Sequence, residues 1–465
     1  MNKPIGLKIF VVLTTLLFLS CDNDNTLLER ESGSGISYKS TEEEEKFLDS
    51  LQYYSFLYFL NEINPENGLV KDRSTETSPS SIAAVGWAYP VWAIGAEHGW
   101  ITREYASGLT LNSFRFFMNS DQSGDTLSTG YKGFYYHFLD METGKRWRKC
   151  ELSTIDTEWL IAGVRFARQY YDRDNPVEQE IRELADSMTF RIDWDWATLP
   201  DDAGENHGSI SMGWRPEKGF SKAGWIGYNE ALLLYITASG SGYKQYESAY
   251  NRWLSRYLWI EPYPGLAHVE FPPLFGHQYS EMFVDFRGLY DSYMKEKGID
   301  YFENSRRATL VQRQYAIDNP NGWEGYDSLT WGLTACDGPQ HDMELDPDKY
   351  WGYSARGTNG TEAGTRDDGT IAPTALGGAI VFAPGVIIPS LKAMYDKYGD
   401  KGLWGKYGMV DAFNLTVDWY DKDYLGLDQG PIVIMIENLR TGLVWEYSMK
   451  DSVNIKGLQK LGFIE

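Results

Sequence analysis

The sequence predicts an all-α protein whose helices pair along the chain into a toroid. Two observations favour this fold class: about ten to twelve helical patterns follow one another, and no run of strand-like alternation interrupts them convincingly. Long loops join the helices, as in proteins that build a site on one end of a helical scaffold. We therefore expect function to lie in the loops and at the helix ends.

Residues 1–20 are typical of a signal peptide, because Lys3 and Lys8 precede an apolar run too short for an ordinary membrane-spanning helix. The run ends in "FLSC", which resembles a bacterial lipobox, so we expect Cys21 to be acylated; a plain secretory signal is the alternative. The polar residues 21–40, with their Gly and Ser, are typical of a flexible tether. We expect a cell-envelope location, lipid-anchored at the outer membrane or periplasmic, and the acidic residues after Cys21 resemble a surface-export signal.

Helix signals continue from residue 41 to the C-terminal region. Thr41 stands three residues before Glu44, the spacing of a capping box. Asn175, Pro176 and Glu178 give a cap, a first-turn proline and a cap-box acid in order. The other helical patterns cover 80–99, 101–120, 153–171, 228–239, 243–257, 279–296, 301–318, 371–381, 386–398 and 428–439. No Pro/Ser-rich linker follows residue 40, so residues 41–465 are predicted to be one domain.

Four loops of twenty residues or more separate these helices, at 120–150, 191–227, 258–278 and 319–370. Loops of that length inside a compact domain are usually functional. Short β-hairpins are expected within them, at the active-site end.

Composition narrows the classes of function. The net charge of −23 and the absence of a basic block argue against nucleic acid as a partner. Aromatic residues make up 15% of the chain, and many lie in polar, Gly-rich segments that suit stacking on sugar rings. Cys150 and Cys336 are too few for a disulfide framework, and whether they pair is left open.

Five segments resemble one known family: "LSTIDTEWLIAG", "GWIGYNEALLLYI", "PPLFGHQYSEMFVDFRG", "GTIAPTALGGAI" and "YLGLDQGPIVIMIENLRTGLVW". They are similar, in this order, to the glycoamylase-like proteins of Bacteroidetes, which include the β-1,2-glucanases of glycoside hydrolase family 144. The resemblance implies an (α/α)6 barrel, or six-hairpin toroid. It also implies an inverting hydrolase of β-1,2-glucan or its oligosaccharides, endo or exo, that acts without metal or cofactor. We expect the protein to be a monomer.

Inverting hydrolysis needs a protonated acid and an ionised base on opposite sides of the sugar. Glu230 suits the acid, because it is an isolated carboxylate before the apolar run "ALLLYI" and shares a helical face with Leu233, Leu234 and Thr237. The alternative is a first-turn glutamate that the helix dipole favours. We predict Glu230 to be the catalytic acid.

Asp428 suits the base, because "DQGP" places it in a Gly/Pro turn where backbone donors can hold it ionised; a simple N-cap is the alternative. Glu437 lies nine residues further along the same helix, too far to flank the same bond. We expect Glu437 to pair with Arg440 or with another arginine.

Asp156 is predicted to bind a sugar hydroxyl or to tune Glu230, since it shares a helical face with Leu160, Gly163 and Ala167. Glu158 falls on the face of Arg165 and Gln169, and is expected to point to solvent. A first-turn acid favoured by the dipole is the alternative for Asp156.

Further candidates for substrate binding are polar or aromatic residues of the loops. They are Asp72, Arg73, Trp214, Trp225, His277, Gln278, Tyr279, Trp351, Arg366 and Asp367. Acid–arginine neighbours are more often structural pairs, and a lone histidine is as often structural as functional. No HExxH, paired-histidine or Cys/His motif predicts a metal hydrolase, and no GxSxG predicts an α/β-hydrolase.

Three functions remain open from the sequence. The first is the β-1,2-glucan hydrolase, the second a glucoamylase-like hydrolase of another glucan, and the third a surface lipoprotein that binds glycans without catalysis. The two hydrolases share one set of carboxylates and differ in the substrate pocket. In the binding protein, Glu230 and Asp428 would be dispensable.

Overall fold

Helices make up most of the regular structure in the computed structural model, which describes residues 38–358 and 366–464. The chain divides into two units, Met1–Tyr38 and Lys39–Glu465. The predicted signal segment, nearly all of the tether and Cys21 lie outside the described residues. None of the described helices combines the length and the apolar character that a membrane span requires.

The α-helices follow one another from residue 42 to residue 460. In chain order they are α2 (Glu42–Asn61), α3 (Ile82–Glu97), α4 (Arg103–Asn119), α5 (Thr154–Tyr170), α6 (Pro176–Phe190), α7 (Leu232–Ser241), α8 (Tyr246–Leu254), α9 (Ser292–Lys297), α10 (Tyr301–Asp318), α11 (Thr374–Gly377), α12 (Pro384–Tyr398), α13 (Gly426–Arg440), α14 (Leu443–Ser448) and α15 (Ser452–Lys460). Two short 3-10 helices used below are η2 (Leu274–His277) and η3 (Ser280–Met282).

The strands are short, and all their pairings are antiparallel. They are β1 (Ile63–Asn64), β2 (Leu69–Val70), β3 (Ser80–Ser81), β4 (Gly130–Tyr131), β5 (Phe134–Tyr136), β6 (Phe138–Leu139), β7 (Leu152–Ser153), β8 (Gly213–Arg215), β9 (Gly219–Phe220), β10 (Trp259–Ile260), β11 (His268–Val269), β12 (Ala335–Cys336), β13 (Ser354–Ala355), β14 (Thr370–Ile371), β15 (Trp404–Gly405), β16 (Gly408–Met409), β17 (Phe413–Asn414) and β18 (Trp419–Tyr420). The largest sheet has the order β4-β5-β7-β8-β9 and joins two of the long loops. Strand pairs expected in those loops are therefore present.

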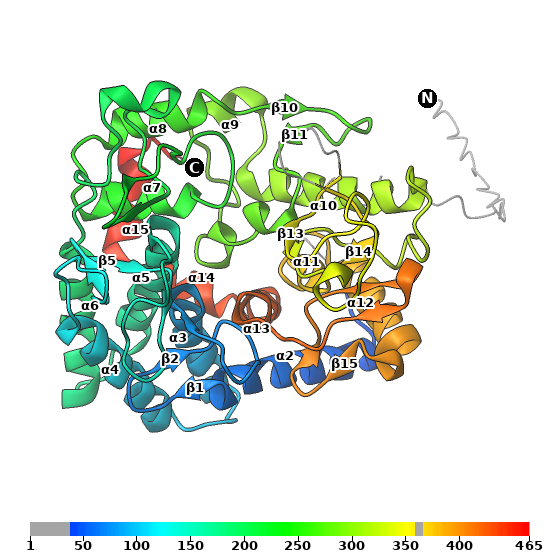
Figure 1. Ribbon diagram of the computed structural model, residues 1–465, viewed down its shortest axis with the longest axis horizontal. Helices are drawn as coiled ribbons and strands as arrows, with labels where there is room; N and C mark the ends of the chain where they lie inside the picture. The colour runs from blue at the N-terminus through cyan, green and yellow to red at the C-terminus, as the bar shows by residue number, and fades with distance from the viewer. Residues whose placement is uncertain (1–37, 359–365, 465) are drawn as a thin grey trace, which may run out of the picture. The chain divides into compact units, whose positions relative to one another are not determined.

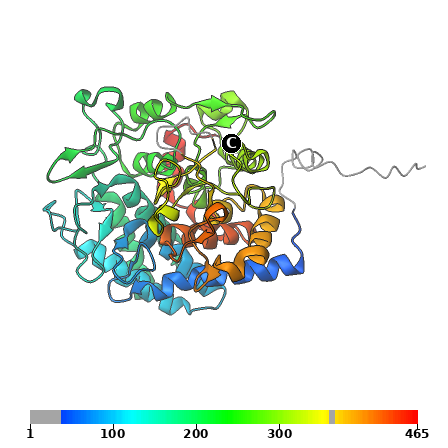
Figure 2. The ribbon, with the colours of Figure 1, turned by 45° about the vertical axis from the view of Figure 1, so that its right-hand side comes forward.

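The most apolar helices lie inside and the amphipathic helices cover them. Nearly every residue of α3, α7 and α13 is buried, as expected for helices that are apolar on all sides. In Figure 1, α13 lies near the centre of the view, and it contacts α2, α3, α11 and α14. Figure 2 shows α2, in blue, beside the orange helix α12, so the first described helix packs on helices from the last quarter of the chain.

Two glycines let α3 and α5 cross at very short distance. A Cβ atom on Gly163 would lie 1.8 Å from the backbone oxygen of Gly86, and one on Gly86 would lie 2.2 Å from the oxygen of Trp159. Real side chains do not tolerate such contacts, so both positions require glycine. The crossing fixes the first turn of α5, which carries Asp156, against α3.

The predicted starts of two helices are confirmed. Thr41 accepts a hydrogen bond from the Glu44 amide, and the Glu44 carboxylate accepts one from the Thr41 amide, which completes the capping box of α2. The Asn175 side chain caps α6, with Pro176 as its first residue.

Other helix boundaries differ from the prediction. The continuous helix expected over 279–296 is wrong: the chain forms η3, turns at Gly288 with a positive φ, and restarts at α9 under the Asp291 cap. The expected helix 371–381 is reduced to α11. The expected helix 228–239 begins only at Leu232, so Glu230 lies in the turn before α7. Cys150 and Cys336 are both free.

Gly163→Ala tests the helix crossing. The added methyl group would force α3 and α5 apart, so we expect the free energy of unfolding to fall by about 1–3 kcal/mol in urea titrations. Gly108→Ala on α4 is the matched control, because a Cβ atom there meets no heavy atom within 4 Å. It should leave stability unchanged or raise it by up to about 1 kcal/mol. Equal effects of the two substitutions would contradict the close crossing.

Candidate active site

A cavity of about 450 Å³, here called the central cavity, collects most of the acidic candidates. It is lined by Asp72, Arg73, His137, Phe138, Ile155, Asp156, Trp159, Glu230, Phe275, Tyr279, Ala335, Tyr353, Leu425, Leu427 and Asp428. Four of these residues carry carboxylates, and the rest are mainly aromatic or apolar. Such a lining suits a ligand with apolar faces and a rim of hydroxyl groups.

The central cavity lies where several buried helices begin. Asp156 belongs to the first turn of α5, Asp428 to the first turn of α13, and Glu230 to the turn before α7. The Ser153 hydroxyl, at the end of β7, accepts a hydrogen bond from the Asp156 amide and so caps α5. Helix N-termini present positive dipole ends, which favour carboxylates at these positions.

Glu230 is fixed by its backbone rather than by a side-chain partner. The Ser280 hydroxyl donates to the Glu230 carbonyl at 2.9 Å and accepts from the Leu233 amide at 3.0 Å, which joins the turn to η3. Burial beside the apolar start of α7 raises the pKa of Glu230 to about 7, and the charge of Asp156 adds to this. The carboxyl is therefore about half protonated at pH 7 and mostly protonated below it, so a substantial share can act as a general acid.

Asp428 faces the same cavity but differs from the prediction in its local structure. It is the third residue of α13, and the residue before the helix is Leu425, so Asp428 lies inside the helix and is not its N-cap. Its Oδ2 atom is buried and accepts no hydrogen bond from the described residues. The expectation that backbone donors hold this carboxylate ionised is therefore wrong.

Asp411 is the close neighbour of Asp428 inside the protein. Burial raises the pKa of Asp428 well above its usual range, and contact with the Asp411 carboxyl raises it further. Burial and the charge of Asp337 likewise raise the pKa of Asp411 to about 8. Two buried carboxyl groups in contact cannot both be ionised readily, so the pair holds a proton between them.

Glu437, at the other end of α13, has no place in the central cavity. Its Oε2 atom lies 2.7 Å from His98 Nε2 and accepts from Gln52 Nε2 at 3.0 Å. The expected pairing of Glu437 with an arginine is therefore wrong, and Arg440 instead binds Glu45 and Asp49. Asp428 and Glu437 thus lie at opposite ends of α13, and only Asp428 lines the central cavity.

Asp156 belongs to a chain of charged groups on one wall. His137 Nε2 lies 3.5 Å from Asp156 Oδ1, and His137 Nδ1 lies 3.0 Å from Glu151 Oε1. Burial opposes the charged imidazolium, but the carboxylates of Asp156, Glu151 and Asp72 outweigh it and raise the pKa of His137 to about 9. Glu158, predicted to face solvent, is fully buried and accepts a hydrogen bond from Thr237. It is buried because α7 packs on that face of α5.

Arg73 connects the central cavity to a second group of acids. Its Nη1 atom lies 2.8 Å from Asp337 Oδ2 and 3.1 Å from Asp423 Oδ2. Arg73 and Tyr353 also line a neighbouring cavity of about 550 Å³, here called the side cavity, together with Trp147, His341 and other residues. The two cavities therefore share a border.

Seven sequence candidates do not line the central cavity. His277 is buried with Nε2 3.0 Å from the Phe271 carbonyl, and Gln278 donates to the Ala375 carbonyl. Trp225 is buried and donates to Thr154 Oγ1, while Trp214 stacks on Tyr131. These four side chains support the loops that frame the cavity, and we do not retain them as substrate-binding residues.

The remaining three belong to the loop that follows residue 350. The Arg366 guanidinium lies 4.6 Å from the ring centre of Trp351. Asp367 accepts hydrogen bonds from Tyr315, Tyr326 and Asn321. The side chains of Trp351, Arg366 and Asp367 thus contact other residues of the loops, and none of the three lines the central cavity.

Sequence reasoning missed His137, Trp159 and Tyr353. Trp159 could have been found, because it lies three residues after Asp156 on the same helical face. His137 and Tyr353 lie in the long loops expected to be functional, but no spacing distinguishes them from neighbouring aromatic residues. Only the fold brings them to the cavity.

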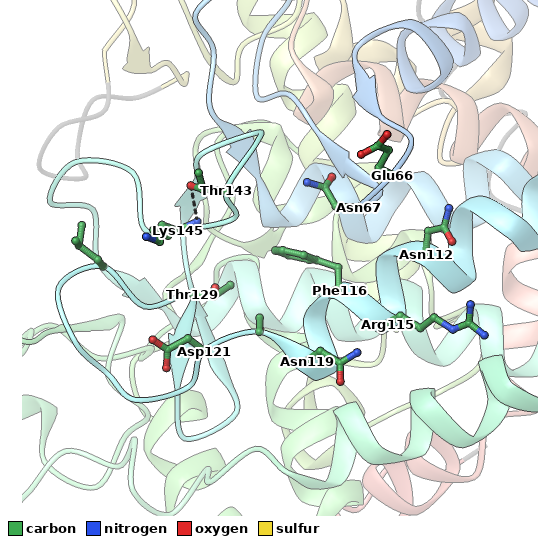
Figure 3. A pocket seen from close by; sticks show the side chains of 12 residues that line it. Glu66, Asn67, Asn112, Arg115, Phe116, Asn119, Asp121, Thr129, Thr143 and Lys145 are labelled. Atoms are coloured by element: carbon green, nitrogen blue, oxygen red, sulfur yellow. Dashed lines mark hydrogen bonds between the residues drawn. The ribbon is translucent and has the colours of Figure 1, made fainter.

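A third cavity, of about 500 Å³, lies along α4 (Figure 3). Asn112, Phe116 and Asn119 of α4 line it, with Glu66 and Asp121 from the loops on either side. Both acids are exposed on the surface, whereas Glu230 and Asp428 lie in the central cavity. This cavity offers no acid–base pair comparable to Glu230 and Asp428.

The residues suited to a metal ion lie outside the central cavity. Within the described ranges, the ligand atoms of Asp337, His341 and Asp421 all lie within 4.8 Å of one another.

Comparisons with known proteins agree with this arrangement of helices. Residues 222–452 match the family "Glycoamylase", described as "Putative glucoamylase". A crystal structure with the same description from Bacteroides uniformis is 31% identical, with a TM-score of 0.78 over 92% of this chain and 99% of that one. An endo-β-1,2-glucanase from Chitinophaga pinensis, solved with sophorotriose and glucose, is 25% identical, with a TM-score of 0.76 over 91% and 99% of the two chains.

A curated relative is the exo-β-1,2-glucooligosaccharide sophorohydrolase (non-reducing end) of Parabacteroides distasonis. It is 29% identical over 99% of this chain. The chain spans 63% of that relative's length.

The raised pKa of Glu230 predicts a pH-dependent stability. The pKa of Glu230 is about 7 in the folded protein, against an ordinary 4.5, so the folded protein loses stability as the pH rises through that range. Glu230→Gln removes this loss, so its stability relative to the wild type should rise by roughly 1–3 kcal/mol between pH 5 and pH 8. Urea unfolding at the two pH values measures it, with the exposed Glu142→Gln as control. A difference between Glu230→Gln and the wild type that is independent of pH would contradict the buried acid.

Proposed function

Because this chain belongs to the glycoamylase-like family, we propose that it is an inverting glycoside hydrolase of β-1,2-glucan or β-1,2-glucooligosaccharides. The observation that carries the proposal is that Glu230 and Asp428 line one cavity. The substrates named for the Parabacteroides distasonis and Chitinophaga pinensis relatives support the β-1,2 linkage. The two alternatives, a hydrolase of another glucan and a glycan-binding protein without catalysis, predict different results in assays of hydrolysis and binding.

Glu230 acts as the general acid in this proposal. It protonates the leaving glycosidic oxygen, and the pKa of about 7 supports that role because a large share of the carboxyl is still protonated near neutral pH. The charge of Asp156 raises the pKa of Glu230, and in this proposal the Asp156 carboxylate also binds sugar hydroxyls. His137 lies beside Asp156. The aromatic rings of Trp159 and Tyr279 offer apolar faces to the CH groups of the sugar.

Asp428 acts as the general base on the other side of the bond. This role requires the proton that the two carboxyl groups share to reside on Asp411, because Asp428 must be ionised to act as a base. The buried Oδ2 atom of Asp428, which no donor among the described residues reaches, then accepts a proton from the attacking water. In inverting hydrolases the acid and base stand roughly 6.5–9.5 Å apart, which leaves room for that water. Asp411, in contact with Asp428, takes part in positioning it.

We also propose that the helices form the (α/α)6 toroid. The pairwise contacts of α3 with α5, α5 with α7, η3 with α13, α11 with α13, and α13 with α3 support an inner ring. The contacts of α2, α4 and α6 with members of that ring support an outer layer. The central cavity then lies at the end of the ring where the inner helices begin.

The substrate prediction concerns linkage and stereochemistry. Purified protein should hydrolyse linear β-1,2-glucan or its oligosaccharides faster than starch, laminarin or cellulose, and NMR should detect the α-anomer of the product first. Activity on starch alone would favour the glucoamylase-like alternative, and an initial β-anomer would contradict inversion. No hydrolysis of any glucan, with glycan binding retained, would favour the binding protein.

The catalytic pair is tested by conservative substitutions. Glu230→Gln and Asp428→Asn should each lower kcat by about 10²–10⁴-fold, because each removes a proton-transfer group. Glu230→Gln should recover in part on an aryl glycoside whose leaving group needs no protonation, whereas azide should rescue only Asp428→Asn.

Glu437→Gln is the matched control for this pair, since Glu437 lies on α13 but contacts His98 and Gln52 away from the cavity. It should retain most of the wild-type kcat in folded protein. A loss of less than tenfold in Glu230→Gln or Asp428→Asn would remove that residue from the chemistry.

A further inference from the structure

Four aspartates gather beside the central cavity with little compensating charge. Asp337, Asp411, Asp421 and Asp423, here called the aspartate cluster, are each at most 9% exposed. Among the described residues, the arginine in ion-pair contact with the cluster is Arg73, which binds Asp337 and Asp423. Several buried carboxylates around one guanidinium leave an excess of negative charge, which is costly unless another cation or protons offset it.

Two oxygen atoms of the aspartate cluster have no hydrogen-bond donor. Asp421 Oδ1 accepts from the amides of Lys422 and Asp423, at 2.7 and 3.2 Å, which holds the carboxylate in place. Its Oδ2 atom is buried, and no donor among the described residues reaches it. Asp411 repeats the pattern in part: Oδ2 accepts from the Asp337 amide at 2.7 Å, and apart from the proton shared with Asp428 no donor among the described residues reaches Oδ1. Fixed, buried oxygens without donors are what a cation site requires.

His341 adds a nitrogen ligand at the edge of the aspartate cluster. Its Nδ1 atom lies 4.0 Å from Asp337 Oδ2, and one ligand atom each from Asp337, His341 and Asp421 lie within 4.8 Å of one another. Atoms that close can share one ion with bonds of about 2.0–2.4 Å. The imidazole is half-exposed and lines the side cavity, which provides a path for the ion from solvent.

We propose that Asp337, Asp421 and His341 bind a divalent cation at the border of the side cavity. Two carboxylates and one imidazole form a mixed oxygen and nitrogen set, which suits Mn²⁺ or Zn²⁺ better than Ca²⁺ or Mg²⁺. Bound there, the ion offsets the charge of the aspartate cluster and joins the loop of Asp337 and His341 to the loop of Asp421. It takes no part in the proposed hydrolysis, since neither Glu230 nor Asp428 is a ligand.

The experiment measures binding directly and does not depend on hydrolysis. Full-length protein is freed of metal with a chelator, and Mn²⁺, Zn²⁺, Ca²⁺ and Mg²⁺ are titrated separately by calorimetry and by thermal unfolding. We expect one saturable Mn²⁺ or Zn²⁺ site per chain and a Tm rise of about 2–5 °C at saturation. Absence of a one-to-one site for all four ions would overturn the proposal, and the aspartate cluster would then rest on Arg73 and protons alone.

Variants test the assignment of ligands. His341→Ala and Asp421→Asn should each weaken binding at least tenfold, whereas Glu344→Gln, an exposed acid of the same loop, should bind as the wild type does. His341 is half-exposed, so its removal keeps the test decisive even where Asp421→Asn fails to fold. If His341→Ala binds the ion as tightly as the wild type does, the assignment of ligands is wrong. Binding of Ca²⁺ but of none of the other three ions to this variant would have the same consequence.

Discussion

The burial of carboxylates where helices begin is the constraint on which this structure depends. Asp156, Glu230 and Asp428 all lie at or just before the start of a buried helix, and all three line one cavity. Helix N-termini lower the cost of placing acids there, and apolar side chains around them exclude water. The exclusion of water raises the pKa of a carboxyl group in this cavity, so the group can keep its proton at a higher pH than it would in solvent.

The same constraint separates the acids by environment. Burial, with a contribution from the charge of Asp156, raises the pKa of Glu230 to about 7. Asp156 faces His137, whose pKa is raised, so a positive charge lies opposite this carboxylate. Asp428 is in contact with Asp411 and shares a proton with it. Burial therefore raises the pKa of all three acids, and they differ in the neighbour that adds to this effect or opposes it.

The aspartate cluster extends this acidic region beyond the central cavity. Arg73 links the two, because it lines the cavity and binds both Asp337 and Asp423. A change in the charge of the cluster would therefore reach the substrate site through Arg73. The structure thus places the excess of negative charge beside the proposed catalytic acids.

Local sequence signals determined the helix-rich class and the caps at Thr41 and Asn175, and they selected Glu230, Asp428 and Asp156, which line the central cavity. These features depend on side chains within a few residues of one another, so spacing along the chain is sufficient to predict them. The tertiary structure alone decided which acids meet. It buried Glu158 under α7, paired Glu437 with His98 and brought His137 to Asp156. It also placed Asp411 against Asp428 and kept Trp225 and His277 as supports of the loops. Such contacts join residues far apart in the chain, and their geometry follows from the packing of whole helices, which local spacing does not encode.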